Sequence, residues 1–209
     1  MEAGDGQQYC GPVAISNSIY WLSKKRGNQE QLIRKLASKP YMNTSLKNGT
    51  GVTGIIRGIA MISKVLFGGY KVLEYEGWRK HPKRYSTGIN IPSETRLTSA
   101  ISERSAAWMN VGWYKYDRTR NEYLRIGGHW VTVVGSNAGK LILHDPAPRA
   151  GREFSNEYVD YTILSSGTLV GNKWGMPFPA PGLISLTEAM HKKRGADFAI
   201  VDGVVYLEI

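Results

Sequence analysis

The spacing of apolar residues changes near residue 106, and this change constrains the fold more than any other feature of the sequence. Before it, apolar residues recur three or four positions apart, as on one face of a helix. After it, aromatic and β-branched residues form short runs between turn residues, which is typical of strands. Helices followed by an antiparallel sheet predict an α+β domain.

Four helices are predicted, and Cys10 is expected at the N-terminus of the first. Pro12 fits the first turn of that helix, where its missing N–H costs nothing. The predicted helices run from Gly11 to about Lys25, from an Asn28 cap to before Pro40, from about Thr53 to Leu66, and from a Ser93 cap through Leu97 and Ile101.

The rest of the chain is predicted to form an antiparallel sheet. Residues 136–139 have the composition of a tight turn that joins two strands as a hairpin. The predicted strands lie at Ala106–Tyr114, His129–Gly135, Lys140–His144, Tyr158–Leu164 and Phe198–Leu207.

One domain over residues 1–209 is expected, because this length suits a single hydrophobic core and no linker or repeat interrupts it. No window approaches the roughly 18 apolar residues of a membrane-spanning helix, so no transmembrane segment is expected. The N-terminus lacks the basic and apolar regions of a signal peptide. Since such a peptide can be removed, the compartment stays open: secreted or cell-envelope after removal, and cytoplasmic otherwise.

The formal net charge is +10, with basic clusters at 24–26, 79–84 and 192–194. This excess favours anionic partners such as an acidic cell envelope or an acidic peptide. No recognisable nucleic-acid-binding motif accompanies it, so nucleic acid is not an expected partner. We interpret the clusters mainly as solvated surface.

Cys10 is the only cysteine of the chain. An internal disulfide and a zinc site built from several thiolates are therefore excluded, which leaves Cys10 as either core filler or a reactive thiol. A helix N-terminus favours the thiolate. A catalytic thiolate also needs a histidine as its base and a third group that orients the histidine.

His129 and Asp145 can supply this pair. His129 opens one predicted strand, and Asp145 closes the next. Because a hairpin returns the chain to its starting end, the two side chains fall at the same end of paired strands. His129 can then face Cys10 while Asp145 holds the other ring nitrogen. The adjacent His144 points to the opposite face of its strand and is not expected to address His129.

Three blocks of the sequence resemble a known family. Gln-Gln-Tyr-Cys-Gly-Pro-Val-Ala around Cys10, Gly-Gly-His-Trp-Val-Thr-Val-Val-Gly around His129 and Ile-Leu-His-Asp-Pro-Ala around Asp145 are similar to blocks of the papain-like cysteine peptidases related to the bacteriocin-processing, double-glycine leader peptidases. They occur in the family's order and approximate spacing, across roughly Gln7 to Pro148. The resemblance implies a papain-like fold, in which a helical lobe packs on an antiparallel sheet. It also implies a Cys10–His129–Asp145 triad that cleaves peptide bonds through a thioester, with no cofactor.

The sequence departs from the family's pattern at one position. Relatives commonly place an oxyanion-stabilising glutamine about six residues before the cysteine, where this chain has Gly4. Gln7 and Gln8 are the nearest substitutes. We favour Gln8, acting with the backbone N–H of Cys10, as the pair of donors for the oxyanion.

A peptide or protein is the expected substrate, but other interpretations stay open. The same triad could transfer its acyl group to an amine, as in a transglutaminase-like enzyme, and a noncatalytic binding module on the same fold is the alternative from another class. A metal site is not expected, because the four histidines show no paired spacing. His81 and His191 adjoin basic residues and are expected to be solvated.

Overall fold

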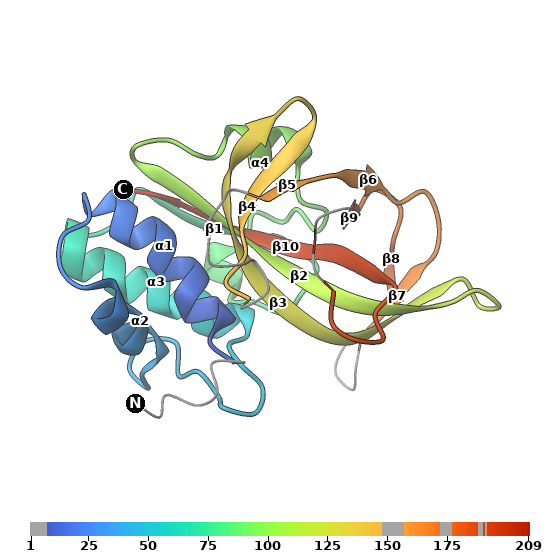
Figure 1. The fold of residues 1–209 in the computed structure, drawn as a ribbon, viewed down its shortest axis with the longest axis horizontal. Helices are drawn as coiled ribbons and strands as arrows, with labels where there is room; N and C mark the ends of the chain where they lie inside the picture. Colours follow the sequence, from blue (N-terminus) through green and yellow to red (C-terminus); the bar gives the residue numbers. More distant parts are fainter. Residues whose placement is uncertain (1–7, 148–156, 172–176, 188–189, 191) are drawn as a thin grey trace.

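A computed structural model describes residues 8–147, 157–171, 177–187, 190 and 192–209. Within these residues, four α-helices accompany one large, mainly antiparallel sheet (Figure 1). The protein is thus a mixed helix and sheet structure, as the change in apolar spacing predicts. None of the helices in the described part combines the length and the apolar character that crossing a membrane requires.

The four helices agree closely with the predicted ones. Asn28 caps α2, since its side chain accepts a hydrogen bond from the Gln31 N–H, and Ser93 caps α4 in the same way. Two helices end earlier than expected: the first ends at Leu22 and not at about Lys25, and Ile101 lies beyond the fourth. The helices are α1 (Cys10–Leu22), α2 (Gln29–Ala37), α3 (Val52–Phe67) and α4 (Glu94–Ser99), with a short 3-10 helix η1 at Lys83–Tyr85.

The strands differ more from the prediction. The strand that contains His129 begins at Glu122, and the single strand expected over 158–164 is divided at Asp160 into two. Strands β1, β7, β8 and β9 were not predicted. The strands are β1 (Val72–Gly77), β2 (Ser105–Asp117), β3 (Glu122–Asn137), β4 (Lys140–His144), β5 (Glu157–Val159), β6 (Tyr161–Ile163), β7 (Thr168–Val170), β8 (Phe178–Pro179), β9 (Ile184–Leu186) and β10 (Phe198–Glu208).

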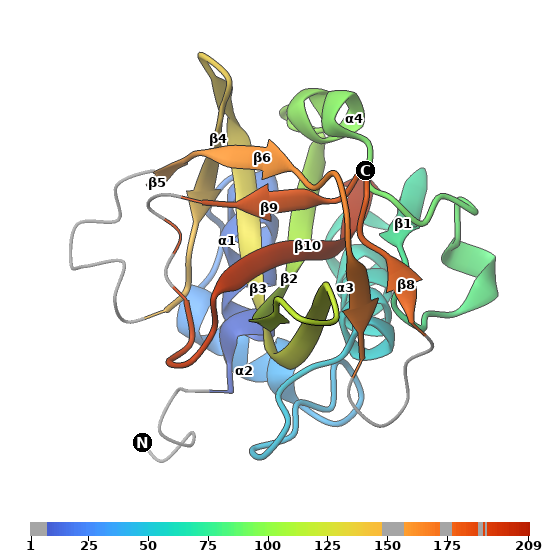
Figure 2. The same ribbon diagram turned by 90° about the vertical axis from the view of Figure 1, so that its right-hand side faces the viewer.

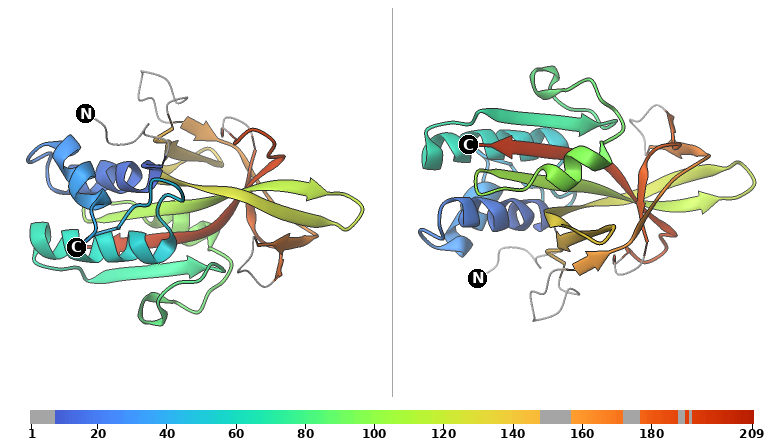
Figure 3. Two further views of the ribbon diagram at one scale, coloured as in Figure 1. Left: turned by 90° about the horizontal axis from the view of Figure 1, so that it is seen from below. Right: turned by 90° about the horizontal axis from the view of Figure 1, so that it is seen from above.

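The sheet has the strand order β5-β4-β3-β2-β10-β9-β6, with β1 also paired to β10 and β7 paired in parallel to β3. The predicted hairpin joins β3 to β4, because Asn137 pairs with Lys140 across a two-residue loop. Both loop residues, Ala138 and Gly139, have positive φ, as the tight hairpin turn that matches strand twist requires. The end of the β2–β3 hairpin projects away from the helices (Figure 3).

Each face of the sheet has its own apolar core. On one face, α1 and α3 pack against Trp108 and Trp130, and these helices gather on one side of the molecule (Figure 1). On the other face, Leu97 of α4 and residues of β9 pack against Met109 and Val131, with α4 placed apart from the first three helices (Figure 2). The central strands are therefore buried on both faces.

Helix α1 is held against the sheet by hydrogen bonds as well as by apolar packing. The carbonyl oxygen of Ala14 accepts from Trp108 Nε1 at 3.1 Å and from Thr132 Oγ1 at 2.7 Å. Trp130 Nε1 donates to the carbonyl oxygen of Thr50, 2.9 Å away, in the loop before α3. These bonds fix the first turns of α1 relative to β2 and β3.

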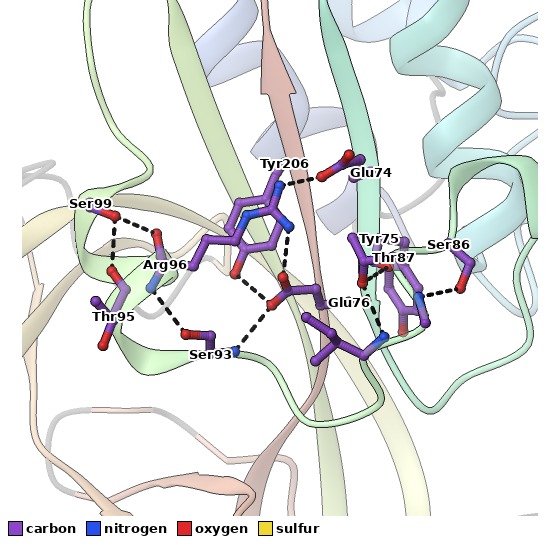
Figure 4. A network of polar contacts seen from close by, with 12 residues as sticks. Glu74, Tyr75, Glu76, Ser86, Thr87, Ser93, Thr95, Arg96, Ser99 and Tyr206 are labelled. Carbon is purple, nitrogen blue, oxygen red and sulfur yellow. Dashed lines mark hydrogen bonds and ion pairs between the residues drawn. The ribbon is translucent and has the colours of Figure 1, made fainter.

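A buried carboxylate ties α4 to the sheet (Figure 4). The side chain of Glu76 in β1 is 1% exposed, and its Oε1 lies 2.6 Å from Nη1 of Arg96. Its other oxygen accepts from the Ser93 N–H and from the hydroxyl of Tyr206. Arg96 also pairs with Glu74 and lies over the Tyr206 ring. Arg96 thus supplies the counter-charge of the buried Glu76 carboxylate.

Replacing Arg96 should therefore destabilise the fold more than an ordinary surface substitution does. We expect Arg96→Ala to lower the free energy of unfolding by about 2 to 3 kcal/mol, because it leaves a buried carboxylate without its counter-charge. The control is Arg34→Ala, which breaks the exposed pair with Glu30 on α2 and should cost at most about 0.5 kcal/mol. Urea denaturation of the two variants tests this, and equal midpoints would contradict it.

Candidate active site

Cys10 is the first residue of α1, as predicted, and lies where that helix meets the sheet and α3. The next residue is a glycine for a steric reason. A Cβ on Gly11 would lie 2.8 Å from Cδ1 of Ile55 in α3, closer than side chains pack. The small residue lets the beginning of α1 sit tightly against α3, which positions the thiol.

The early end of β4 opens the edge of β3 that faces Cys10. The two strands pair as far as Thr132 and His144, where β4 ends. Beyond that point, the edge of β3 is available to α1, and the backbone N–H of Trp130 donates to the Cys10 sulfur. The N–H at this strand edge thus donates to the sulfur of Cys10 instead of to a neighbouring strand.

His129 and Asp145 meet next to this edge. Nε2 of His129 lies 2.5 Å from Oδ1 of Asp145, and the two side chains are only 9% and 1% exposed. The same carboxylate oxygen accepts from the backbone N–H of Ala147 at 2.8 Å. Trp113 stacks on the imidazole with ring centroids 5.7 Å apart and planes 19° apart. The ring of His129 is therefore held on one edge by a carboxylate and on one face by an indole.

Cys10 completes the arrangement. Its thiol forms a hydrogen bond with the side chain of His129. Because Nε2 is bound to Asp145, Nδ1 is the ring nitrogen left for the sulfur. The sulfur also receives backbone N–H groups from Trp130 and Gly11. All these contacts favour the thiolate form of Cys10.

The electrostatics of the pair follow from these contacts. Burial raises the pKa of the Cys10 thiol, but the hydrogen bond to His129, the charge of that imidazolium and the two backbone N–H groups outweigh burial and lower this pKa. Burial lowers the pKa of His129, but its hydrogen bonds to Asp145 and Cys10 and their negative charges outweigh burial and raise the pKa to about 9. Both shifts favour the charged pair of thiolate and imidazolium over the neutral pair.

The structure brings together the three side chains that the sequence singled out, but His129 does not come from the start of its strand. His129 lies inside β3 and does not open it, because the strand begins at Glu122. His129 and Asp145 meet because β4 ends before it reaches the level of His129. Asp145 then follows the last residue of β4 and reaches back to the ring.

His144 is the last residue of β4. It pairs with Thr132, whose side chain faces α1. It also lines a cavity of about 790 Å³ between α1 and the β3–β4 edge, together with Val13 and Trp21 among others. Asp145 borders the same cavity, so the cavity adjoins the outer side of the site.

The other residues considered from the sequence have varied outcomes. Gln8 precedes α1, and its side-chain oxygen lies against Gly49. Gln7 and His191 lie outside the described residues. The expectation that His81 is solvated is wrong: it is half-buried, its Nδ1 lies 2.7 Å from the carbonyl oxygen of Arg79, and its ring packs beside Tyr75, which local charge does not reveal.

Two contributors to the site were not predicted as such. The first is the Trp113 ring over His129, and the second is the Trp130 N–H at the sulfur. The sequence holds a signal for the first, since Trp113 lies in the strand that a hairpin would place beside His129. The sequence holds no signal for the Trp130 N–H, because every residue except proline has a backbone N–H. Only the end of β4 makes the N–H of Trp130 available to the sulfur.

The site is built without any evident place for a metal ion. Among the residues that the structure describes, no group of three or more histidine, cysteine, aspartate or glutamate side chains could hold one.

No family model matches this sequence, and no curated protein matches it at a significant level. The geometry of the site therefore carries the functional argument.

The reactivity of Cys10 tests this geometry directly. Since Cys10 is the only cysteine, modification of the protein by iodoacetamide reports on it alone. We expect the rate to rise with pH through an inflection well below about 8.5, the value of an ordinary thiol. In His129→Ala, which removes the imidazolium, the inflection should move upward. An inflection at or above the ordinary value in the unaltered protein would contradict the proposed ion pair.

Proposed function

We propose that the chain is a papain-like cysteine peptidase, similar to the bacteriocin-processing peptidases, that hydrolyses peptide bonds through a thioester. One observation carries the proposal. A thiol at a helix N-terminus, an imidazole and a carboxylate come from α1, β3 and the end of β4 and meet in that order. This is the order of nucleophile, base and orienting group in thiol hydrolysis.

Each group has a defined role in the proposed reaction. The Cys10 thiolate attacks the carbonyl carbon of the scissile bond, and the electron pair of the C=O moves to oxygen. When this intermediate collapses, the C–N bond breaks and the His129 imidazolium gives its proton to the leaving amine. Water then attacks the thioester, His129 takes a proton from it, and the thiolate leaves. Asp145 keeps the imidazole in the orientation that allows both transfers.

The oxyanion needs donors of its own. The backbone N–H of Cys10, at the N-terminus of α1, is the first donor that we propose, because such groups have no partner within the helix. We propose the side-chain amide of Gln8 as the second. Gln8 lies two residues before Cys10, with only the N-cap Tyr9 between them, so a rotation of its side chain away from Gly49 would bring the amide toward the nucleophile.

A peptide library incubated with the protein tests the proposed activity. We expect cleavage by the unaltered protein and none by Cys10→Ala, because the variant lacks the nucleophile but loses only a few buried atoms. Mass spectrometry identifies the products, and thermal unfolding shows whether the variant keeps its fold. An added amine separates hydrolysis from acyl transfer, since an amide product would indicate the latter. Undiminished cleavage by the folded variant would refute the mechanism.

The role of Asp145 can be separated from that of its neighbour. We expect Asp145→Asn to lower turnover about tenfold or more, because the amide no longer stabilises the imidazolium. It should also move the alkaline limb of the pH profile, near 9 in the unaltered protein, to lower pH, since loss of the negative charge lowers the pKa of His129.

His144→Ala is the matched control for this substitution. His144 lies one residue away and faces α1, so its loss should change turnover by less than about threefold and leave the alkaline limb in place. A collapse of activity in His144→Ala with Asp145→Asn unaffected would show that the wrong residue was assigned.

A further inference from the structure

The backbone immediately before His129 is open to solvent and lies against a cationic side chain. Gly128 is exposed, although the two residues after it are buried. A Cβ on Gly128 would lie only 2.2 Å from Nη2 of Arg125 and 3.1 Å from its Cζ. The guanidinium thus occupies the space over Gly128 that a side chain would fill. Gly128 is the residue before His129 in β3.

Arg125 is anchored from behind by a buried carboxylate. Its Nε lies 2.7 Å from Oδ2 of Asp202, which is fully buried in β10, and its own side chain is only 9% exposed. The other oxygen of Asp202 accepts from the hydroxyl of Tyr114 and from Trp78 Nε1. Asp202 is therefore well supplied with donors, and the guanidinium is fixed in position.

The guanidinium has more donors than these neighbours can use. It carries five N–H groups, and its hydrogen-bonding neighbours are Asp202 and the Tyr114 hydroxyl. Of the terminal nitrogens, Nη2 lies against Gly128, whose backbone is exposed, so N–H groups remain for a ligand on that side. Burial lowers the pKa of Arg125, but the charges and hydrogen bonds of Asp202 and Tyr114 outweigh it and raise this pKa, so the group stays cationic.

A second cation lies on the other face of the same short segment. A Cβ on Gly127 would approach Nζ of Lys193 to 3.6 Å, and this ammonium donates to the carbonyl oxygen of Ile126 at 3.3 Å. The strand segment that leads to His129 is thus flanked by Arg125 on one face and Lys193 on the other. This local charge agrees with the net charge of +10 on the whole chain.

We propose that Arg125 is a specificity-determining residue, which binds a carboxylate of the substrate through its terminal N–H groups beside Gly128. The carboxylate belongs to an acidic side chain within one or two residues of the scissile bond or to the C-terminus of the substrate, because Gly128 adjoins His129. The substrate class is therefore an acidic peptide segment. This proposal rests on the peptidase function proposed above.

Matched peptides test the preference. Peptides that differ only by glutamate or glutamine at one position near the scissile bond, and peptides with a free or an amidated C-terminus, distinguish the two sources of the carboxylate. We expect the unaltered protein to favour one carboxylate form by about 10- to 100-fold in kcat/KM, as charge-assisted hydrogen bonds provide. Equal rates for all matched pairs would overturn the proposal.

Variants assign the preference to Arg125. In Arg125→Gln/Asp202→Asn, which removes both buried charges together, the preference should disappear. In Asp202→Asn alone, which leaves the guanidinium uncompensated, it should increase. Arg125→Lys keeps a cation for Asp202 but has no second nitrogen for Gly128, so it should also lose the preference and serves if the double variant does not fold. Arg34→Gln, which removes a guanidinium from the exposed surface of α2, should keep it. A preference that persists in the folded Arg125 variants would overturn the assignment.

A second readout does not depend on peptidase activity. Cys10 can be modified by 3-maleimidopropanoate or by its neutral amide, two reagents that differ in the carboxylate. The rate for the carboxylate reagent divided by the rate for the amide should be several-fold lower in Arg125→Gln/Asp202→Asn than in the unaltered protein. The His129 imidazolium is present in both proteins, so its attraction for the carboxylate does not change this comparison. If no peptide is cleaved but the ratio falls, the peptidase function fails and the anion site stands. If peptides are cleaved and neither the ratio nor the peptide preference changes, the anion site fails.

Discussion

The whole site depends on how α1 is held against the sheet. The carbonyl oxygen of Ala14 accepts hydrogen bonds from side chains of β2 and β3, one helical turn after Cys10. Because a helix is stiff over one turn, these bonds set the place of the sulfur relative to β3. The contact of Gly11 with Ile55 of α3 fixes the same turn from the other side. The packing of α1 on the sheet and on α3 therefore sets where the thiol meets His129.

The second constraint is the end of β4 at His144. A longer β4 would cover the edge of β3 and take up the N–H of Trp130, which instead donates to the sulfur. The same ending frees Asp145 from the sheet, so its carboxylate turns toward the ring of His129. Burying a carboxylate to 1% exposure is costly unless hydrogen bonds compensate it, and here the imidazole and the Ala147 N–H do so. One strand ending thus supplies both a donor for the thiolate and an acceptor for the imidazolium.

The sequence predicts those parts of the structure that local patterns encode. Apolar spacing and the caps Asn28 and Ser93 predicted the helices, and turn composition predicted the hairpin that brings His129 and Asp145 to one end. It did not predict β1, in which Glu74 and Glu76 alternate with the buried Leu73 and Tyr75. The counter-charge of the buried Glu76 comes from Arg96, twenty residues later. The pair of Arg125 and Asp202 is separated by 77 residues, and no local spacing links them.

That pair raises a question of energetics. A buried ion pair is weak evidence for stability, since apolar residues of similar volume often serve as well. Asp202 also requires Tyr114 and Trp78 as donors, and the close approach of Gly112 to its carboxylate oxygens leaves no room for a side chain. Removing these charged groups from water costs more free energy than burying apolar side chains of the same volume. What the pair provides in addition is a rigid guanidinium with Nη2 against the exposed Gly128, the residue before His129. An apolar replacement would reproduce the packing but could not bind an anion at that point, so recognition of a carboxylate explains the pair more fully than stability does.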